Sequence, residues 1–314
     1  MVLEQNAGQP RFAVCLAAYN GMEFIVEQIE SILAQRDVTL QIHISVDRSA
    51  DGTEATLGAW ALREPRLTIL PGGQRFGAAG PNFYRLLRDV DLAGYDYLSF
   101  ADQDDIWQPE KLLRAHRMLE QHGALGYSSN FTAFWSSGRE RFVDKALPQR
   151  SADFLFESAG PGCTYVLHTR LATALQELVR GAGPALLQID YHDWLAYAFA
   201  RARGMAWVID PWSSMRYRQH ARNQIGVNAG WRSFWLRVRQ VLNGYAFEQS
   251  RLIAEVVGGS AVGLAQPASR EGRLGYLAMA MRAPQCRRRR ADQALFFISC
   301  LLLAIVNPAR QARA

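Results

Sequence analysis

The sequence predicts an α/β fold in which a mainly parallel sheet is flanked by helices. Short apolar runs rich in β-branched residues alternate with segments whose apolar residues recur at helical spacing. Three of the runs end in polar loops of the kind that joins a strand to a helix. The chain has 314 residues, of which 49% are hydrophobic and 20% charged, so it can bury a large core.

The first half of the chain alternates regularly between the two kinds of segment. Four apolar runs are expected to be strands: 12–18, 40–46, 67–70 and 95–101. Four other segments are expected to be helices: 23–35, 53–63, 82–89 and 109–122. The stretch 71–82 is rich in Gly and Pro and is therefore expected to be a long loop.

The second half is less regular and becomes helical towards its end. Three further strands are expected at 127–134, 164–167 and 206–209. Four helices are expected at 191–202, 231–242, 245–257 and 273–281. We therefore divide the chain into an α/β domain, residues 1–226, and a helical C-terminal region, residues 227–314.

The net charge of +6 hides a strong asymmetry. Residues 216–314 contain 16 Arg, no Lys and four acidic residues, a net charge of +12, whereas the rest of the chain carries −6. The basic part is expected to meet an anionic partner. The four cysteines lie far apart without metal-ligand spacing, and no signal peptide is recognisable, so a reduced, cytoplasmic compartment is expected.

Three carboxylates follow the fourth expected strand within four residues: Asp102, Asp104 and Asp105. Like charges this close repel one another, and a bound cation would relieve the repulsion. Oxygen ligands at a strand end suit Mg²⁺ or Mn²⁺, usually shared with a phosphate-bearing substrate. The alternative is a solvated acidic turn that opens the helix near Pro109.

Polar loops at 18–21, 47–53 and 102–107 each follow an expected parallel strand. Ligands of such sheets bind beyond the carboxyl ends of the strands. The three loops are therefore expected to converge on one ligand site.

Three motifs in the first half resemble those of family-2 inverting glycosyltransferases, which have a GT-A fold. They are Ala-Ala-Tyr-Asn-Gly at 17–21, Val-Asp-Arg-Ser-Ala-Asp-Gly-Thr at 46–53, and Asp-Gln-Asp-Asp-Ile-Trp at 102–107 followed by Pro109 and Lys111. The last of these resembles the DxD segment of the family. The resemblance covers about residues 11–226 and points to the branch that includes bacterial rhamnosyltransferases.

The resemblance implies a site for a nucleoside-diphosphate sugar. The residues that it assigns to this ligand are Ala18, Tyr19, Asn20, Asp47, Arg75, Asn82, Asp102, Gln103 and Arg218. Those that it assigns to the sugar and acceptor side are Asp105, Trp107, Gly162, Cys163, Thr164, His192 and Trp194. Many relatives carry a second acid where this chain has Val46. The alternative for Asp47 and Asp51 is a turn pair in which Asp51 caps the next helix.

The resemblance also implies a metal site and a general base. Asp104 and His220 would hold Mg²⁺ or Mn²⁺, and the metal would stabilise the departing diphosphate. Asp193 would take the proton of the acceptor hydroxyl. The alternatives are a structural role for His220 and, for Asp193, the role of an acid that stabilises a helix N-terminus.

Arg287–Arg290 precede residues 294–306, which carry no charge. This apolar segment is shorter than the roughly 20 residues that a spanning helix needs. Arginines beside apolar segments suit an anionic membrane surface. The alternative is a core or oligomer-forming helix with solvated arginines, and no nucleic-acid-binding motif is recognisable.

Together these observations predict a metal-dependent inverting glycosyltransferase. It would transfer a sugar of the dTDP-rhamnose or UDP-sugar type to a hydroxyl of a glycan or lipid-linked acceptor in bacterial cell-surface polysaccharide synthesis. Its expected place is the cytoplasm, peripheral to the inner face of the membrane. The alternatives are a nucleotidyltransferase that makes a nucleotide sugar, and a non-catalytic membrane scaffold.

Overall fold

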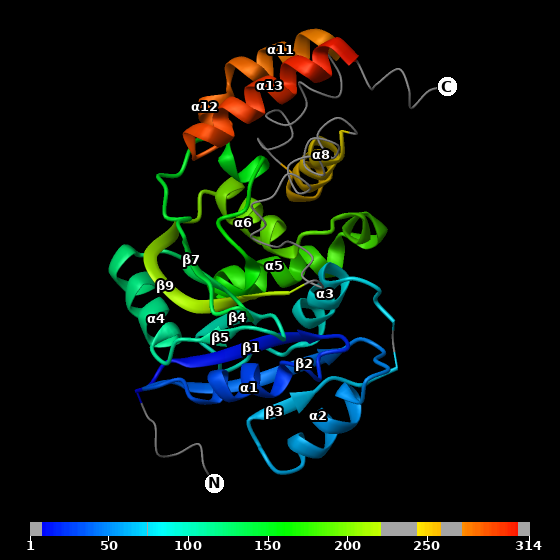
Figure 1. Ribbon diagram of the computed structural model, residues 1–314, viewed down its shortest axis with the longest axis vertical. Helices are drawn as coiled ribbons and strands as arrows, with labels where there is room; N and C mark the ends of the chain where they lie inside the picture. The colour runs from blue at the N-terminus through cyan, green and yellow to red at the C-terminus, as the bar shows by residue number, and fades with distance from the viewer. Residues whose placement is uncertain (1–7, 74, 221–243, 259–271, 307–314) are drawn as a thin grey trace.

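The computed structural model describes residues 8–73, 75–220, 244–258 and 272–306. Within these ranges nine strands form one sheet in the order β3-β2-β1-β4-β8-β6-β9-β5, with β7 paired to β6. Helices cover the sheet, and helices α8, α11, α12 and α13 extend the molecule at one end (Figure 1). The predicted α/β class is confirmed.

The N-terminal half of the sheet is parallel, as predicted. It consists of β1 (Arg11–Ala18), β2 (Thr39–Val46), β3 (Leu67–Ile69) and β4 (Tyr97–Ala101). In β1 every residue after Arg11 is buried, because strands pair with it on both sides and helices cover it. Ala18 lies opposite Val46 and Leu16 opposite Ala101, so β1, β2 and β4 end at the same edge of the sheet.

Antiparallel pairs appear in the second half of the sheet. Its strands are β5 (Ile106–Trp107), β6 (Gly126–Trp135), β7 (Glu140–Val143), β8 (Val166–His168) and β9 (Trp207–Gln219). β8 is antiparallel to β4 and β6, whereas β9 runs parallel to β6 and antiparallel to β5. β9 continues ten residues beyond the predicted end at 209. This extension returns the chain to the segment that follows β4.

Six helices accompany the sheet: α1 (Ile25–Leu33), α2 (Thr53–Ala61), α3 (Ala79–Asp89), α4 (Lys111–His122), α5 (Thr169–Gly181) and α6 (His192–Ala202). Three short 3₁₀ helices are η1 (Asp153–Leu155), η2 (Gly162–Thr164) and η3 (Gly183–Gln188). α3 begins inside the expected loop 71–82, because Pro81 is compatible with the first turn of a helix. The sequence patterns did not predict α5.

The core has two parts, one on each face of the sheet. Alternate residues of β1 supply them: Phe12, Val14 and Leu16 join the part under α1 and α4, whereas Ala13 and Cys15 join the part under α3, α5 and α6. The side chains of Asp193's helix, α6, are buried along most of its length. The site described below therefore rests on rigid elements.

The C-terminal region consists of α8 (Tyr245–Val257), α11 (Gly272–Met281), α12 (Ala283–Cys286) and α13 (Arg290–Val306) in the described ranges. The helices expected at 245–257 and 273–281 are confirmed, and that expected at 231–242 lies outside the described residues. Ile253 of α8 and Cys300 and Leu303 of α13 belong to the same core part as α6. Within the described residues, no helix is both long and apolar enough to cross a membrane.

Candidate active site

The polar loops after β1, β2 and β4 are joined by side-chain hydrogen bonds, as their expected convergence requires. The Gln103 side chain accepts a hydrogen bond from the Tyr19 N–H at 2.8 Å and donates one to the Tyr19 carbonyl at 2.9 Å. Asn20 Oδ1 accepts a hydrogen bond from the Ala50 N–H at 2.8 Å. A Cβ atom at Gly21 would lie 2.4 Å from Gln103 Oε1, so the contact requires glycine.

Asp47 and Asn82 shape the neighbouring wall through backbone groups. The buried Asp47 carboxylate accepts hydrogen bonds from the Phe76 N–H at 3.0 Å and the Gly77 N–H at 2.8 Å. Asn82 Nδ2 donates to the Ser45 carbonyl at 3.1 Å. Both residues were predicted to contact a nucleotide; in the structure their hydrogen bonds hold the loop before α3 and the end of β2.

Arg75 and Tyr19 are the exposed members of the set predicted to bind the nucleotide. Arg75 lies on the loop that Asp47 anchors and is exposed to solvent. The Tyr19 side chain is 53% exposed although its backbone is held on both sides. An exposed aromatic ring on a rigid backbone offers a face on which a planar ligand can stack.

The acidic segment, residues 102–107 after β4, is held by hydrogen bonds from two sides. The Asp105 N–H donates to Gln28 Oε1 at 2.7 Å, and Asp105 Oδ1 accepts from the Arg218 N–H at 3.1 Å. Asp105 is only 1% exposed, and its Oδ2 accepts no hydrogen bond from the described residues. Burial and the charges of Asp104 and Asp102 raise the pKa of Asp105 well above its usual range. The buried Asp105 therefore helps to hold the acidic segment in place.

Lys111 is a buried cation beside these carboxyl groups. It is fully buried in α4, its Nζ donates to the Cys163 carbonyl at 2.5 Å, and it lies 3.1 Å from the centroid of the Trp107 ring. Burial lowers the pKa of Lys111 to about 7, against the opposing pull of Asp105 and Asp102. The motif Pro-x-Lys was visible in the sequence, but nothing in the pattern showed that this lysine faces inward.

Asp104 and His220 meet although 116 positions separate them in the sequence. His220 Nε2 and Asp104 Oδ2 are 2.7 Å apart, and both side chains are partly exposed. Arg218 Nε donates to the Asp104 carbonyl at 2.9 Å, and its guanidinium also pairs with Glu27. The extension of β9 is what brings Arg218 and His220 to the acidic segment.

Asp193 stands in the first turn of α6. Its Oδ1 accepts a hydrogen bond from the Trp194 N–H at 2.7 Å, and burial raises the pKa of Asp193 to about 6. Burial, followed by the charge of Asp104, raises the pKa of Asp102 to about 7, and the charge of Asp193 adds to this effect. The predicted base therefore shares an electrostatic environment with the acidic segment.

The neighbours of Asp193 pack it in place. A Cβ atom at Gly162 would lie 2.5 Å from His192 Nε2 and 3.1 Å from Asp193 Cβ, so only glycine permits this approach. His192 stacks on Phe83 at 3.8 Å between ring centroids, and burial lowers its pKa to about 3, which keeps it neutral. Trp194 Nε1 donates to the Phe154 carbonyl at 2.9 Å.

Two more residues predicted on the acceptor side lie in η2. Thr164 is buried, and its Oγ1 donates to the Pro161 carbonyl at 2.8 Å. Cys163 is also buried, and its sulfur, one carboxylate oxygen of Asp102 and one of Asp105 lie within 4.8 Å of one another. η2 thus links the acidic segment to the helix that carries Asp193.

The fold and this convergence of acidic and polar loops at one sheet edge are those of a GT-A-type glycosyltransferase. Residues 13–172 match the family described as Glycosyl transferase family 2, and the chain belongs to this family. It is 40% identical over 293 residues to the dTDP-rhamnosyl transferase RfbG of Shigella flexneri, a match that covers 93% of this chain and 99% of that protein.

Other relatives are more distant. The chain is 32% identical over 124 residues to the succinoglycan biosynthesis protein ExoO of Rhizobium meliloti (strain 1021), which is 37% of this chain and 31% of that protein. The structure of S. aureus TarS 1–349 in complex with UDP-GlcNAc matches with a TM-score of 0.53 at 13% identity, over 96% of this chain and 92% of that chain. The mannosyltransferase PcManGT from Pyrobaculum calidifontis, in complex with GDP-Man and Mn²⁺, matches with a TM-score of 0.52 at 17% identity, over 98% of this chain and 88% of that chain. At these identities the structural matches show the fold.

Proposed function

We propose that this glycosyltransferase is a metal-dependent, inverting enzyme whose donor is a nucleoside-diphosphate sugar, with dTDP-rhamnose as the first candidate. The identity of 40% to a dTDP-rhamnosyl transferase over nearly the whole chain supports this donor. The acceptor is a hydroxyl of a glycan or lipid-linked intermediate in bacterial cell-surface polysaccharide synthesis. The enzyme acts in the cytoplasm at the inner face of the membrane.

One observation carries the proposal: Asp193 packs against Gly162, and the sulfur of the next residue, Cys163, lies within 4.8 Å of carboxylate oxygens of Asp102 and Asp105. A base and a diphosphate-binding segment must flank the same anomeric carbon for an inverting transfer.

The nucleotide occupies the surface formed by the loops after β1 and β2. Tyr19 presents its exposed ring for stacking, and Gln103 keeps the Tyr19 backbone in place. Asp47 and Asn82 act indirectly, because their hydrogen bonds position the walls of the pocket. Arg75 offers an exposed cation from the anchored loop, which suits the diphosphate.

The donor set at Asp104 and His220 fits a divalent metal. A carboxylate oxygen and an imidazole nitrogen converge to 2.7 Å while both side chains keep access to solvent. Mn²⁺ and Mg²⁺ accept such oxygen ligands, and imidazole suits Mn²⁺ better than Mg²⁺. The neighbouring group of Asp102, Asp105 and Cys163 fits less well, because sulfur is a soft ligand that does not suit Mg²⁺ or Mn²⁺. A metal at Asp104 and His220 would offset the negative charge of the departing diphosphate.

Asp193 supplies the proton acceptor for the transfer. The acceptor oxygen attacks the anomeric carbon from the face opposite the diphosphate, and the new C–O bond forms as the bond to the diphosphate breaks. The hydroxyl proton passes to Asp193, and the nucleoside diphosphate leaves with the electron pair. A carboxyl group with a pKa of about 6 is ionised at neutral pH and still basic enough for this role.

The test is a transfer assay with purified enzyme, Mn²⁺, a panel of dTDP-, UDP- and GDP-sugars, and glycan or lipid-linked acceptors. We expect release of the nucleoside diphosphate and a glycosylated product, with a loss of about 10³-fold in Asp193→Asn. Asp37→Asn, a change at an exposed carboxylate in the turn before β2, is the matched control and should stay active. Pyrophosphate release from a nucleoside triphosphate would instead indicate a nucleotidyltransferase.

A further inference from the structure

Helices α11 and α13 expose an unusual amount of apolar surface. Eight of the 13 large apolar side chains that are exposed in the described chain belong to these two helices: Leu274, Leu277, Met281, Leu295, Phe297, Ile298, Leu302 and Ile305. The two helices lie side by side at the end of the molecule away from β1–β3 (Figure 1). Contiguous exposed apolar surface of this kind marks an interaction site.

The exposed residues form stripes rather than scattered points. On α13, Leu295, Ile298, Leu302 and Ile305 recur at intervals of three and four residues, and Ile305 is 71% exposed. The opposite side of α13 is buried in the core through residues such as Cys300. On α11 the same spacing relates Leu274, Leu277 and Met281. Each helix is therefore anchored on one face and apolar on the other.

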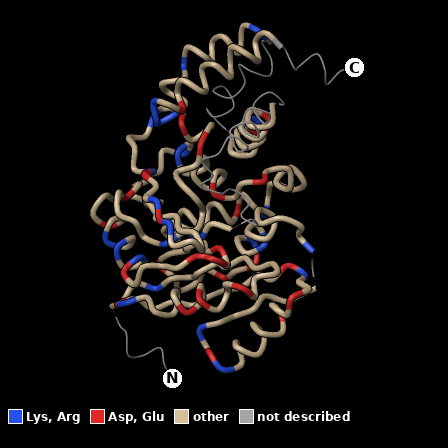
Figure 2. Tube along the Cα trace, in the orientation of Figure 1, with Lys and Arg blue, Asp and Glu red and all other residues tan. Residues whose placement is uncertain are grey.

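Arginines stand at the ends of these stripes. Arg289 and Arg290 are exposed at the start of α13, and Arg273 is exposed near the start of α11. Figure 2 shows Lys and Arg mainly at the ends of the two helices, with long uncharged stretches between them. Apolar side chains flanked by cations are the arrangement that binds an anionic lipid surface, with the apolar groups in the acyl boundary and the arginines at the headgroups.

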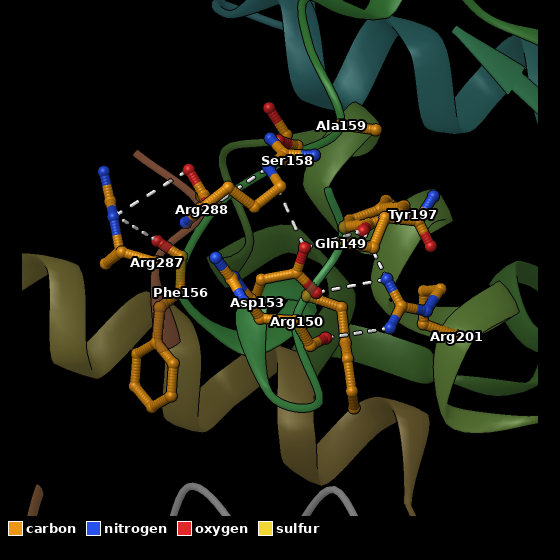
Figure 3. Close-up of polar contacts among 12 residues, drawn as sticks. Gln149, Arg150, Asp153, Phe156, Ser158, Ala159, Tyr197, Arg201, Arg287 and Arg288 are labelled. Atoms are coloured by element: carbon orange, nitrogen blue, oxygen red, sulfur yellow. Dashed lines mark hydrogen bonds and ion pairs between the residues drawn. The ribbon is translucent and has the colours of Figure 1, made fainter. Parts of the chain in front are cut away.

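The neighbouring arginines, Arg287 and Arg288, have a different task. The Arg288 side chain is 3% exposed, and its Nε lies 3.3 Å from Glu157 Oε1 and 3.8 Å from Asp153 Oδ2. The backbone N–H of Arg288 also donates to Glu157 Oε1, at 2.6 Å. Arg287 Nη1 donates to the Phe156 carbonyl at 2.7 Å. Figure 3 shows both guanidinium groups turned towards the η1 segment. The predicted basic cluster is thus divided: two arginines bind the protein, and two face solvent.

Asp153 connects this clamp to the helix that carries Asp193. Its carboxylate accepts hydrogen bonds from the Tyr197 hydroxyl at 3.0 Å and from Arg201 Nη1 at 3.1 Å, and both donors are on α6 (Figure 3). Arg288 approaches the same carboxylate from the start of α13. The exposed stripes are therefore rigidly attached to the catalytic half of the molecule.

We infer that the exposed apolar faces of α11 and α13, with Arg273, Arg289 and Arg290, dock on a bilayer that contains anionic lipids. This inference rests on the proposed function: the surface would hold the active site at a set position relative to a membrane-borne acceptor. A second copy of the chain fits less well, because residues 272–306 contain six Arg and one acidic residue, and this positive charge would oppose self-association through the two helices. α13 lies along the surface and does not cross it, in keeping with its length of 17 residues.

The test is flotation of the full chain with vesicles of phosphatidylcholine, alone or mixed with phosphatidylglycerol. We expect binding to the anionic vesicles, weakened by high salt, and at least about tenfold weaker binding to the neutral ones. Ile298→Glu/Leu302→Glu should lower binding about tenfold or more. Its matched control is Leu62→Glu, at a leucine that is 88% exposed next to α2, and it should bind like the wild type. Ile305→Gln is a milder second variant, with circular dichroism as the check of folding.

A second pair of variants isolates the charge. Arg289→Gln/Arg290→Gln should weaken binding to anionic vesicles, whereas Arg117→Gln/Arg170→Gln, at exposed arginines of α4 and α5, should not. Equal vesicle binding by Ile298→Glu/Leu302→Glu and the wild type would overturn the inference. The inference would also be overturned if the wild type formed a dimer and did not bind vesicles, and if Ile298→Glu/Leu302→Glu dissociated that dimer. Transfer to a soluble acceptor is measured in parallel, so that loss of docking and failure of the proposed activity are distinguished.

Discussion

The Nζ atom of Lys111 lies 2.5 Å from the carbonyl oxygen of Cys163, and no part of this lysine is exposed. It joins α4 to η2 beneath the acidic segment. The charges of Asp102 and Asp105 both act on it, and it acts on Asp102 in return. Lys111 and these carboxyl groups therefore form one buried cluster whose charges influence one another at the end of β4.

Removal of the Lys111 amine should destabilise the fold. We expect Lys111→Met to lower the free energy of unfolding by about 2 kcal/mol, because the buried Cys163 carbonyl loses its hydrogen bond and Asp102 and Asp105 lose a nearby basic group. Urea denaturation at pH 7 measures this. Arg117→Met, at an exposed cation of the same helix, should change little. Adding Asp105→Asn to Lys111→Met should restore part of the lost stability. Strictly additive effects of the two substitutions would contradict an interaction between the two residues.

The rate of transfer should depend on pH through Asp193. Burial raises the pKa of this carboxyl to about 6, and a general base acts only when deprotonated. The rate constant under saturating donor should therefore fall about tenfold per pH unit below pH 6 and level off above it. A profile that is flat from pH 5 to pH 8 would remove Asp193 from the role of base.

The same shift has a consequence for stability. Because the pKa of Asp193 is higher in the folded chain than its usual value, folding favours the protonated form, and stability is lost as the pH rises towards 6. Asp193→Asn should therefore melt at an increasingly higher temperature than the wild type between pH 4 and pH 6, with a constant difference above. Thermal melts across this range check it, and Asp37→Asn should show no such trend.

Metal removal should stop transfer, and substitutions at Asp104 and His220 should change the metal dependence to different degrees. We expect a chelator to abolish activity and Mn²⁺ or Mg²⁺ to restore it. His220→Gln should raise the metal concentration needed for half-maximal rate by about tenfold or more, and Asp104→Ala should abolish transfer without lowering the melting temperature much. Full activity in the presence of a chelator would exclude a metal at this pair.

The two arginines at the junction with α13 should differ sharply. Arg288→Met is expected to cost about 3 kcal/mol of stability, because Asp153 and Glu157 lose a buried partner. Arg289→Met, one position along and exposed, should be close to neutral. Chemical denaturation of both variants gives the comparison. Similar losses in the two would show that Arg288 does not clamp the C-terminal region.

The strands β1, β2 and β4 and the meeting of their loops could be predicted, because apolar runs and Gly- and Asp-rich turns are local signals. Other features depend on contacts between distant segments. The extension of β9 to Gln219 contains polar residues and Pro211, and only pairing with β6 and β5 makes it a strand. β5 has two residues, too few for any periodicity.

The candidate site shows the same division. The pairing of Asp104 with His220 followed from motifs, whereas the hydrogen bonds of Asp47 to the Phe76 and Gly77 N–H groups carry no sequence signal, because backbone donors are the same at every position. Likewise, nothing local separates the buried Arg288 from the exposed Arg289. Burial of single charges is decided by the partners that the fold brings to them.

The Asp47 anchor makes the loop before α3 open to redesign. Among the described residues of the loop, Asp47 binds two backbone N–H groups and no side chain, so the bonds survive any replacement at position 75 or 76 except proline at 76. Substitutions at Arg75 and its neighbours should therefore leave the position of the loop backbone unchanged. On the proposed function, a library of such variants is a way to search for altered donor preference.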